Sequence, residues 1–248
     1  SNSGAGLDKI TEIVSEKISN DHYGRRFKAL LIAYGVKYDF CRFYEILHEE
    51  KLAYFVVLNS SMTVSSIEEI DLEELSMFIR LHEIVSVEMP FFLAEKLELD
   101  GYNSIERVLF EFTKGDFQGD ISVDESPKLD EVFEILKESF SLDNCYELWL
   151  TDTSHQIRHG ISKIFLYNST TATMYYEIDN VAFFGQIATA ANARGKGYAR
   201  ELLYWLEDKM SKNDVSAQLF AKPHRVSFYE GIGFKEIGRD LILERENI

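Results

Sequence analysis

Cysteine is scarce in this sequence: only Cys41 and Cys145 occur, one in each half of the chain. They have no metal-ligand spacing, and two isolated cysteines in 248 residues favour a reducing cytoplasm over a disulfide scaffold. The sequence also has no run of eighteen apolar residues, so no transmembrane helix is expected. Residues 1–6 lack the basic and apolar regions of a signal peptide and look like a tag remnant or a disordered terminus.

Basic residues are few relative to acidic ones: 26 Lys and Arg stand against 42 Asp and Glu, for a net charge of -16. Residues 1–125 carry a net charge of -12 and residues 126–248 a net charge of -4. This balance argues against a nucleic-acid partner. It is weakly compatible with a cationic amine substrate, but acidity that only serves solubility is the better explanation. We expect no nucleic-acid or membrane partner, and a monomer or homodimer.

The length allows one large domain or two smaller ones. In the first half, helical spacing begins at Leu7, and Asp71 followed by Glu74 is a helix-capping pattern. A turn at Asn59-Ser60 between two apolar runs indicates a hairpin. The elements expected here are helices starting at 7, 71 and 91 and strands at 29–34, 53–58, 62–65 and 105–113.

A polar stretch at 113–128, with two glycines and Pro127, is the best domain boundary. We expect an N-terminal α/β domain at 7–120 and a second domain at 126–248. The second is predicted as an α+β fold, with a mixed, mostly antiparallel sheet flanked by helices. Its expected helices are 129–140, 197–212 and 226–232, and its expected strands are 147–151, 161–166, 171–177, 181–189, 217–221 and 234–243.

The most informative segment is the glycine-rich turn that follows the strand at 181–189 and opens the helix at 197–212. Small residues at Gly195, Gly197 and Ala199 let the backbone approach a ligand closely. Unpaired amides and the helix dipole at such a turn favour an anion, and Arg194 and Lys196 add positive charge. The turn predicts a pyrophosphate site, although a tight turn without a ligand is also possible.

The turn reads Arg194-x-x-Gly197-x-Ala199, and Phe228-Tyr229-Glu230-x-x-Gly233-Phe234 follows downstream. In these two motifs residues 126–245 resemble the GCN5-related N-acetyltransferase (GNAT) family. The resemblance implies acetyl-CoA as co-substrate and an acyltransferase that passes its acetyl group directly to a primary amine, with no metal. The N-terminal half has an element order compatible with a degenerate copy of the same fold, which would make the chain a tandem GNAT pseudo-dimer.

The resemblance also implies roles for particular residues. Gln186, Ile187, Ala188 and Thr189 would contact the pantetheine arm, and Arg194, Gly195, Lys196, Gly197, Tyr198 and Ala199 would hold the pyrophosphate. Tyr229 stands where the family often places the general acid, although a buried packing tyrosine is the simpler alternative.

Two positions depart from the family pattern. Lys222 stands where the family commonly has an asparagine, and Arg225 where it has an alanine. The strand at 181–189 contains no carboxylate, so a general base would have to be Glu177, Asp179, Asp152, a histidine or a chain of waters. These departures from the family pattern allow a second class of function: a non-catalytic regulator that binds acyl-CoA.

A polar cluster occupies 152–160, which is expected as a hairpin bordering the acceptor site. Asp152, His155, Arg158 and His159 could bind an acceptor or move a proton, and together with Glu177 they are the candidate substrate residues. Local hydrogen bonding at a surface turn is an equally good explanation of the cluster.

Overall fold

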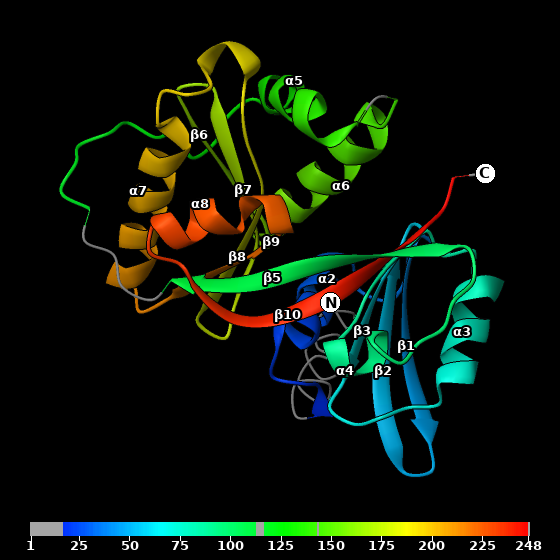
Figure 1. The fold of residues 1–248 in the computed structure, drawn as a ribbon. Helices are drawn as coiled ribbons and strands as arrows, with labels where there is room; N and C mark the ends of the chain where they lie inside the picture. The colour runs from blue at the N-terminus through cyan, green and yellow to red at the C-terminus, as the bar shows by residue number, and fades with distance from the viewer. Residues whose placement is uncertain (1–16, 113–116, 143, 248) are drawn as a thin grey trace, which may run out of the picture. The chain divides into compact units, whose positions relative to one another are not determined.

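The structure is a computed structural model that describes residues 17–112, 117–142 and 144–247 (Figure 1). The expected helix that starts at residue 7 and the segment 1–6 lie largely or wholly outside these residues. The chain forms two compact units: Ser1–Val108 with Gly238–Ile248, and Leu109–Ile237. The last strand thus returns to the first unit, whereas the domain boundaries expected from the sequence, 7–120 and 126–248, remain a prediction.

The first unit contains α2 (His22–Tyr34), β1 (Cys41–His48), β2 (Lys51–Leu58), β3 (Ser61–Ser66), α3 (Leu72–Leu81), β4 (Ser86–Glu88) and α4 (Phe91–Ala94). The first part of β5 (Tyr102–Phe112) and the end of β10 (Lys235–Arg245) complete it. Its strands are ordered β1-β2-β3-β4-β10-β5. Strands β1, β2 and β3 are antiparallel neighbours, while β3 and β4 run parallel.

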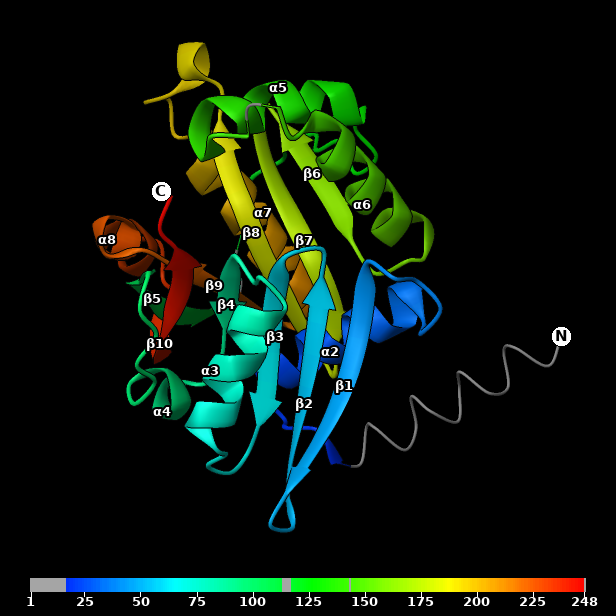
Figure 2. The same ribbon diagram turned by 90° about the vertical axis from the view of Figure 1, so that its right-hand side faces the viewer.

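Two helices cover opposite faces of this first sheet, because neighbouring side chains on a strand point to opposite faces (Figure 2). Phe55 of β2 belongs to the core beneath α3, together with Leu75 and Ile79. Tyr54, the preceding residue, packs its ring edge-on against Phe27 of α2 at 5.4 Å. The sheet is therefore the middle layer of the unit.

The second unit contains α5 (Leu129–Phe140), α6 (Tyr146–Arg158), β6 (Lys163–Tyr167), β7 (Thr170–Ile178), β8 (Val181–Thr189), α7 (Tyr198–Lys212), β9 (Ser216–Ala221) and α8 (Val226–Gly231). Its strands follow the order β5-β9-β8-β7-β6. Strands β6, β7 and β8 are antiparallel neighbours, and β8 and β9 run parallel, joined by the crossover helix α7. The expected α+β class with a mostly antiparallel sheet is confirmed.

Helices also cover both faces of the second sheet (Figure 2). Ile164 and Leu166 of β6 lie in the core formed with α5 and α6. Phe165, between them, faces the other way and packs edge-on against Trp205 of α7 at 5.9 Å.

Two of the strands expected from the sequence are wrong. Residues 29–34 belong to α2, a mostly buried helix whose short apolar run looks the same as a buried strand. Residues 147–151, and the hairpin expected at 152–160, lie mostly in α6. There Trp149 packs against Phe133 at 5.4 Å, so contacts with α5 favour the helix. The other strands and helices expected within the described residues occur, with ends shifted by a few residues.

Candidate functional site

Strand β8 stays paired with β9 for only part of its length. The parallel pairing runs from Val181 with Ser216 to Phe184 with Leu219 and stops there. Just beyond this point the register of β8 with β7 shifts, and Gln186 adopts a positive φ of 47°. An extra residue of this kind is a β-bulge, which bends the strand and re-aims its backbone groups. Residues 186–189 of β8 therefore carry backbone N–H and C=O groups that β9 does not pair.

The glycine-rich turn gives α7 an open N-terminus. Gly195 and Gly197 have φ values of 78° and 81°, a region that side chains with a Cβ rarely occupy. A Cβ built on either glycine would have no atom within 4 Å, so the space over the turn is open. The first helical bond runs from the Glu201 N–H to the Gly197 carbonyl at 3.1 Å. The preceding amides of α7 have no intrahelical acceptor, which makes this terminus suitable for an anion.

Arg194 ties the turn to the end of β8 and to α5. Its Nε donates to the carbonyl of Thr189 at 3.0 Å and its Nη2 donates to the Ser139 hydroxyl at 3.3 Å. The Ala191 N–H donates to Glu138 at 3.0 Å, a second tie between the turn and α5. Arg194 therefore positions the turn, while the exposed Lys196 supplies a cation beside the open amides.

Tyr229 lies on α8 and is only 6% exposed. Its ring packs against Phe110 at 5.9 Å and Phe234 at 5.7 Å. Burial raises the pKa of the Tyr229 phenol, and the nearby Arg225 guanidinium offsets part of that rise. The phenol is therefore protonated at neutral pH, as a proton donor must be.

The polar cluster 152–160 lies mainly on α6. His155 and His159 are one helical turn apart and stack with ring centroids 4.1 Å apart. Arg158 and His159 are exposed, whereas Asp152 is half-buried. Glu177 is exposed on β7, opposite Ala182 of β8. The structure thus brings the two histidines together and places Glu177 on a different element.

Two threonines of β7 flank the bulge, because their partners on β8 lie on either side of it. The hydroxyls of Thr171 and Thr173 are buried with no hydrogen-bond partner among the described residues, and so is Nε1 of Trp149. Leu166 and Ile164 pair with the two threonines and lie in the same core as Trp149. Cross-strand partners lie on the same face of a sheet. The two threonine hydroxyls and Nε1 of Trp149 therefore lie between the bulged part of the sheet and helices α5 and α6.

Glu207, which the sequence did not single out as a candidate, lies on the apolar face of α7 between Leu203 and Met210. It is 2% exposed, and neither carboxyl oxygen has a hydrogen-bond partner within the described part of the chain. Burial raises its pKa to about 9, so the group is neutral at pH 7. A glutamate at a position where helical spacing demands an apolar residue was the available signal.

Among residues 17–112, 117–142 and 144–247, no group of three or more His, Cys, Asp or Glu could hold a metal ion. None of the helices described is long and apolar enough to cross a membrane.

The second unit is thus an α+β domain with one parallel strand pair that separates beside a glycine-rich turn at the N-terminus of α7. Residues 138–246 match the family model of the acetyltransferase (GNAT) domain. No match was found among curated proteins.

Solved structures give fold-level matches over most of the chain. A Drosophila protein has a TM-score of 0.60 at 9% identity, covering 98% of this chain and 96% of its own. A tandem GNAT protein from the clavulanic acid biosynthesis pathway has a TM-score of 0.57 at 6% identity, covering 97% and 93%. A GCN5-related N-acetyltransferase from Sphaerobacter thermophilus has a TM-score of 0.54 at 17% identity, covering 79% and 78%.

The chain therefore contains a GNAT domain at residues 138–246. This domain belongs to an acyltransferase family, and its α+β fold is the one that the sequence motifs predict.

Proposed function

We propose that the second unit binds acetyl-CoA and transfers its acetyl group to a primary amine of a small cationic molecule. The main observation in support of the proposal is that β8 and β9 stop pairing shortly before the open N-terminus of α7. A linear ligand with a polar arm and a pyrophosphate fits this arrangement, because the unpaired strand matches the arm and the helix terminus matches the anion.

The glycine-rich turn would hold the pyrophosphate. A Cβ at Gly195 or Gly197 would meet no atom within 4 Å, so a ligand can approach the turn, and Lys196 adds a full charge to the helix dipole. The backbone of β8 from Gln186 to Thr189 would hydrogen-bond the amides of the pantetheine arm, as an added strand does. Arg194 takes the role of holding the turn in place through Thr189 and Ser139.

Acetyl-CoA supplies an activated thioester, whose acetyl group passes to the amine nitrogen while its sulfur leaves as a thiol. A backbone N–H at the bulge of β8 would stabilise the negative charge that develops on the carbonyl oxygen. Tyr229 would give its proton to the departing sulfur, because a phenol is protonated at neutral pH. No residue of β8 can accept the amine proton, since the strand lacks a carboxylate.

The acceptor would approach the bulge from the side of α5 and α6. Thr171, Thr173 and Trp149 place buried polar groups in this layer that a ligand or buried water could satisfy. Asp152 and His155 on α6 are the candidate proton acceptors for the amine, whereas Glu177 on β7 pairs with Ala182 and lies further along the strand from the bulge. A net charge of -16 would concentrate a cationic acceptor near the protein.

An alternative is a regulator that binds acyl-CoA without turnover, which the missing strand carboxylate and Lys222 in place of asparagine favour. Calorimetry should first establish acetyl-CoA binding. Release of free CoA thiol is then measured with polyamines, aminoglycosides, amino acids and peptide N-termini. Thiol release with at least one amine supports the enzyme, whereas tight binding without release across the panel favours the regulator.

The order of elements in the first unit supports a degenerate copy of the same fold. A helix, three antiparallel strands, a crossover helix and a parallel strand occur as α2-β1-β2-β3-α3-β4 and again as α6-β6-β7-β8-α7-β9. In each series the strand before the crossover helix continues beyond its parallel pairing. Strand β3 runs to Ser66, but its last pair with β4 is Thr63 with Glu88. We therefore propose that the chain is a tandem of two GNAT-like modules.

A further inference from the structure

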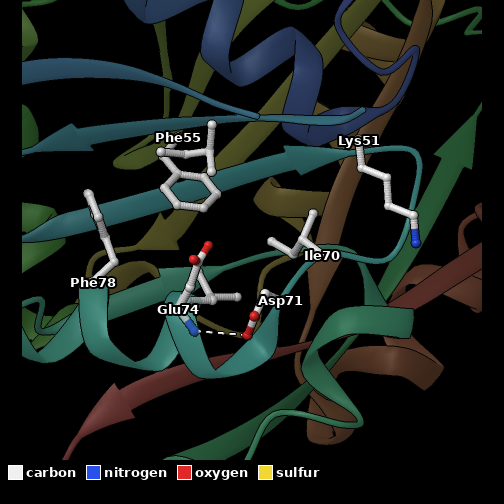
Figure 3. A pocket seen from close by; sticks show the side chains of 8 residues that line it. Lys51, Phe55, Ile70, Asp71, Glu74 and Phe78 are labelled. Carbon is white, nitrogen blue, oxygen red and sulfur yellow. Dashed lines mark hydrogen bonds between the residues drawn. The ribbon is translucent and has the colours of Figure 1, made fainter. Parts of the chain in front are cut away.

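The first unit holds a cavity of about 200 Å³ at the start of α3 (Figure 3). Its walls are apolar side chains from β1, β2 and α3 and from the segment before α3: Ile46, Phe55, Ile70, Leu75 and Phe78. Three charged residues complete the lining: Lys51, Asp71 and Glu74. Lys51 and Glu74 are exposed, so the charged end of the cavity faces water.

Packed aromatic side chains fix the walls. The rings of Phe55 and Phe78 meet edge to face at 5.2 Å. On its other sides Phe78 contacts Tyr44 at 4.9 Å and His82 at 4.1 Å. Phe55 is 3% exposed and Leu75 is 1% exposed, so both belong to the core. The cavity is therefore bounded mainly by packed side chains of β1, β2 and α3.

The start of α3 differs chemically from the start of α7, its counterpart in the repeated element order. Oδ1 of Asp71 accepts the N–H groups of Glu73 at 2.9 Å and Glu74 at 3.1 Å. The helix amides that could hold a phosphate are thus occupied by a carboxylate of the chain itself. Glu73 and Glu74 add further negative charge to the same turn. This terminus therefore disfavours an anionic ligand and favours a cation.

Size and charge together define the ligand. An apolar cavity of about 150 Å³ is large enough for benzene, so about 200 Å³ admits one ring or a branched chain of similar bulk. Two carboxylates and one ammonium at the rim leave a net negative charge. We propose that this cavity is a second ligand site, which binds a small primary amine with its apolar body between Phe55 and Ile70 and its ammonium beside Asp71 and Glu74.

The proposal is tested by titration calorimetry on the full chain without acetyl-CoA, so the readout is independent of acetyl transfer. Phenethylamine is compared with phenethyl alcohol, which lacks the charge, and with 3-phenylpropionate, which reverses it. A charge-assisted contact predicts that the amine binds about tenfold tighter than the alcohol. No binding of the amine, or equal binding of all three probes, overturns the proposal.

Two substitutions locate the site. Ile70→Phe fills the cavity and should abolish amine binding, while Glu74→Gln removes a rim charge at an exposed position and should weaken binding about tenfold. Glu73→Gln is the matched control, because it removes the same charge from the same turn without lining the cavity. Amine binding that survives Ile70→Phe, or that falls equally in both glutamine variants, overturns the proposal; if Ile70→Phe unfolds, the glutamine pair decides.

Discussion

Arg107 of β5 and Asp240 of β10 form a two-point ion pair inside the first unit. Nε donates to Oδ1 at 2.9 Å and Nη2 donates to Oδ2 at 2.7 Å. Asp240 is 0% exposed and also accepts the Tyr23 hydroxyl at 2.8 Å, while Arg107 reaches Glu88 at 3.0 Å. This network links α2, β4 and β5 to the last strand of the chain and explains why the end of β10 belongs to the first unit.

Asp240→Asn should destabilise the protein, because it removes the charge of a fully buried carboxylate and leaves the partly buried Arg107 with one of its two carboxylate partners fewer. The expected loss is about 3–5 kcal/mol in the free energy of unfolding, the range for breaking a buried ion pair. Denaturant titration followed by circular dichroism measures it. Glu106→Gln is the matched control: it breaks the exposed pair of Arg239 with Glu106 at 3.1 Å and should cost no more than about 1 kcal/mol. Equal losses in the two variants would contradict the role of burial.

Glu207→Gln should change how stability depends on pH. Burial raises the folded-state pKa of Glu207 to about 9, so the folded protein binds a proton that the unfolded chain releases above its own pKa of about 4.5. Stability is therefore lost as pH rises from about 4.5 to about 9, and the cost reaches about 3 kcal/mol at pH 7.

The amide of glutamine fills the same space without this titration. The variant should be more stable than the parent at pH 8 and nearly equal to it at pH 4. Thermal unfolding at both values measures the difference. Glu230→Gln, at an exposed position, should leave the pH dependence as it is. A parental pH slope retained in Glu207→Gln would show that this carboxyl is not the cause.

Tyr229→Phe should lower the rate of acetyl transfer with little change in acetyl-CoA affinity. Loss of a general acid typically costs about 10²- to 10⁴-fold in rate. The ring keeps its contacts with Phe110 and Phe234, so the fold should be retained. Steady-state kinetics and calorimetry on the same preparation separate the two effects. An unchanged rate would show that Tyr229 packs in the core without donating a proton in the reaction.

The sequence predicted the second unit well where local chemistry decides the structure. Gly195 and Gly197 indicate the open turn in the sequence, because a positive φ and the close approach of a ligand to the backbone both favour glycine there. The apolar runs at 29–34 and 147–151 misled because tertiary contacts, with the sheet for α2 and with α5 for α6, decide that these segments are helical. Arg107, Glu88 and Asp240 carried no local signal, since only strand pairing brings them together.

Acetyl-CoA binding at the turn is the central claim, and titration calorimetry with Gly197→Val tests it most directly. Gly197 has a φ of 81°, so a β-branched residue must distort the turn, and a side chain there would occupy the open space over the amides. Gly231→Ala is the control, because its Cβ meets nothing within 4 Å and its φ is not positive. The account predicts one acetyl-CoA site that Gly197→Val abolishes and Gly231→Ala preserves. No binding to the parent protein, or undiminished binding to Gly197→Val, would contradict it.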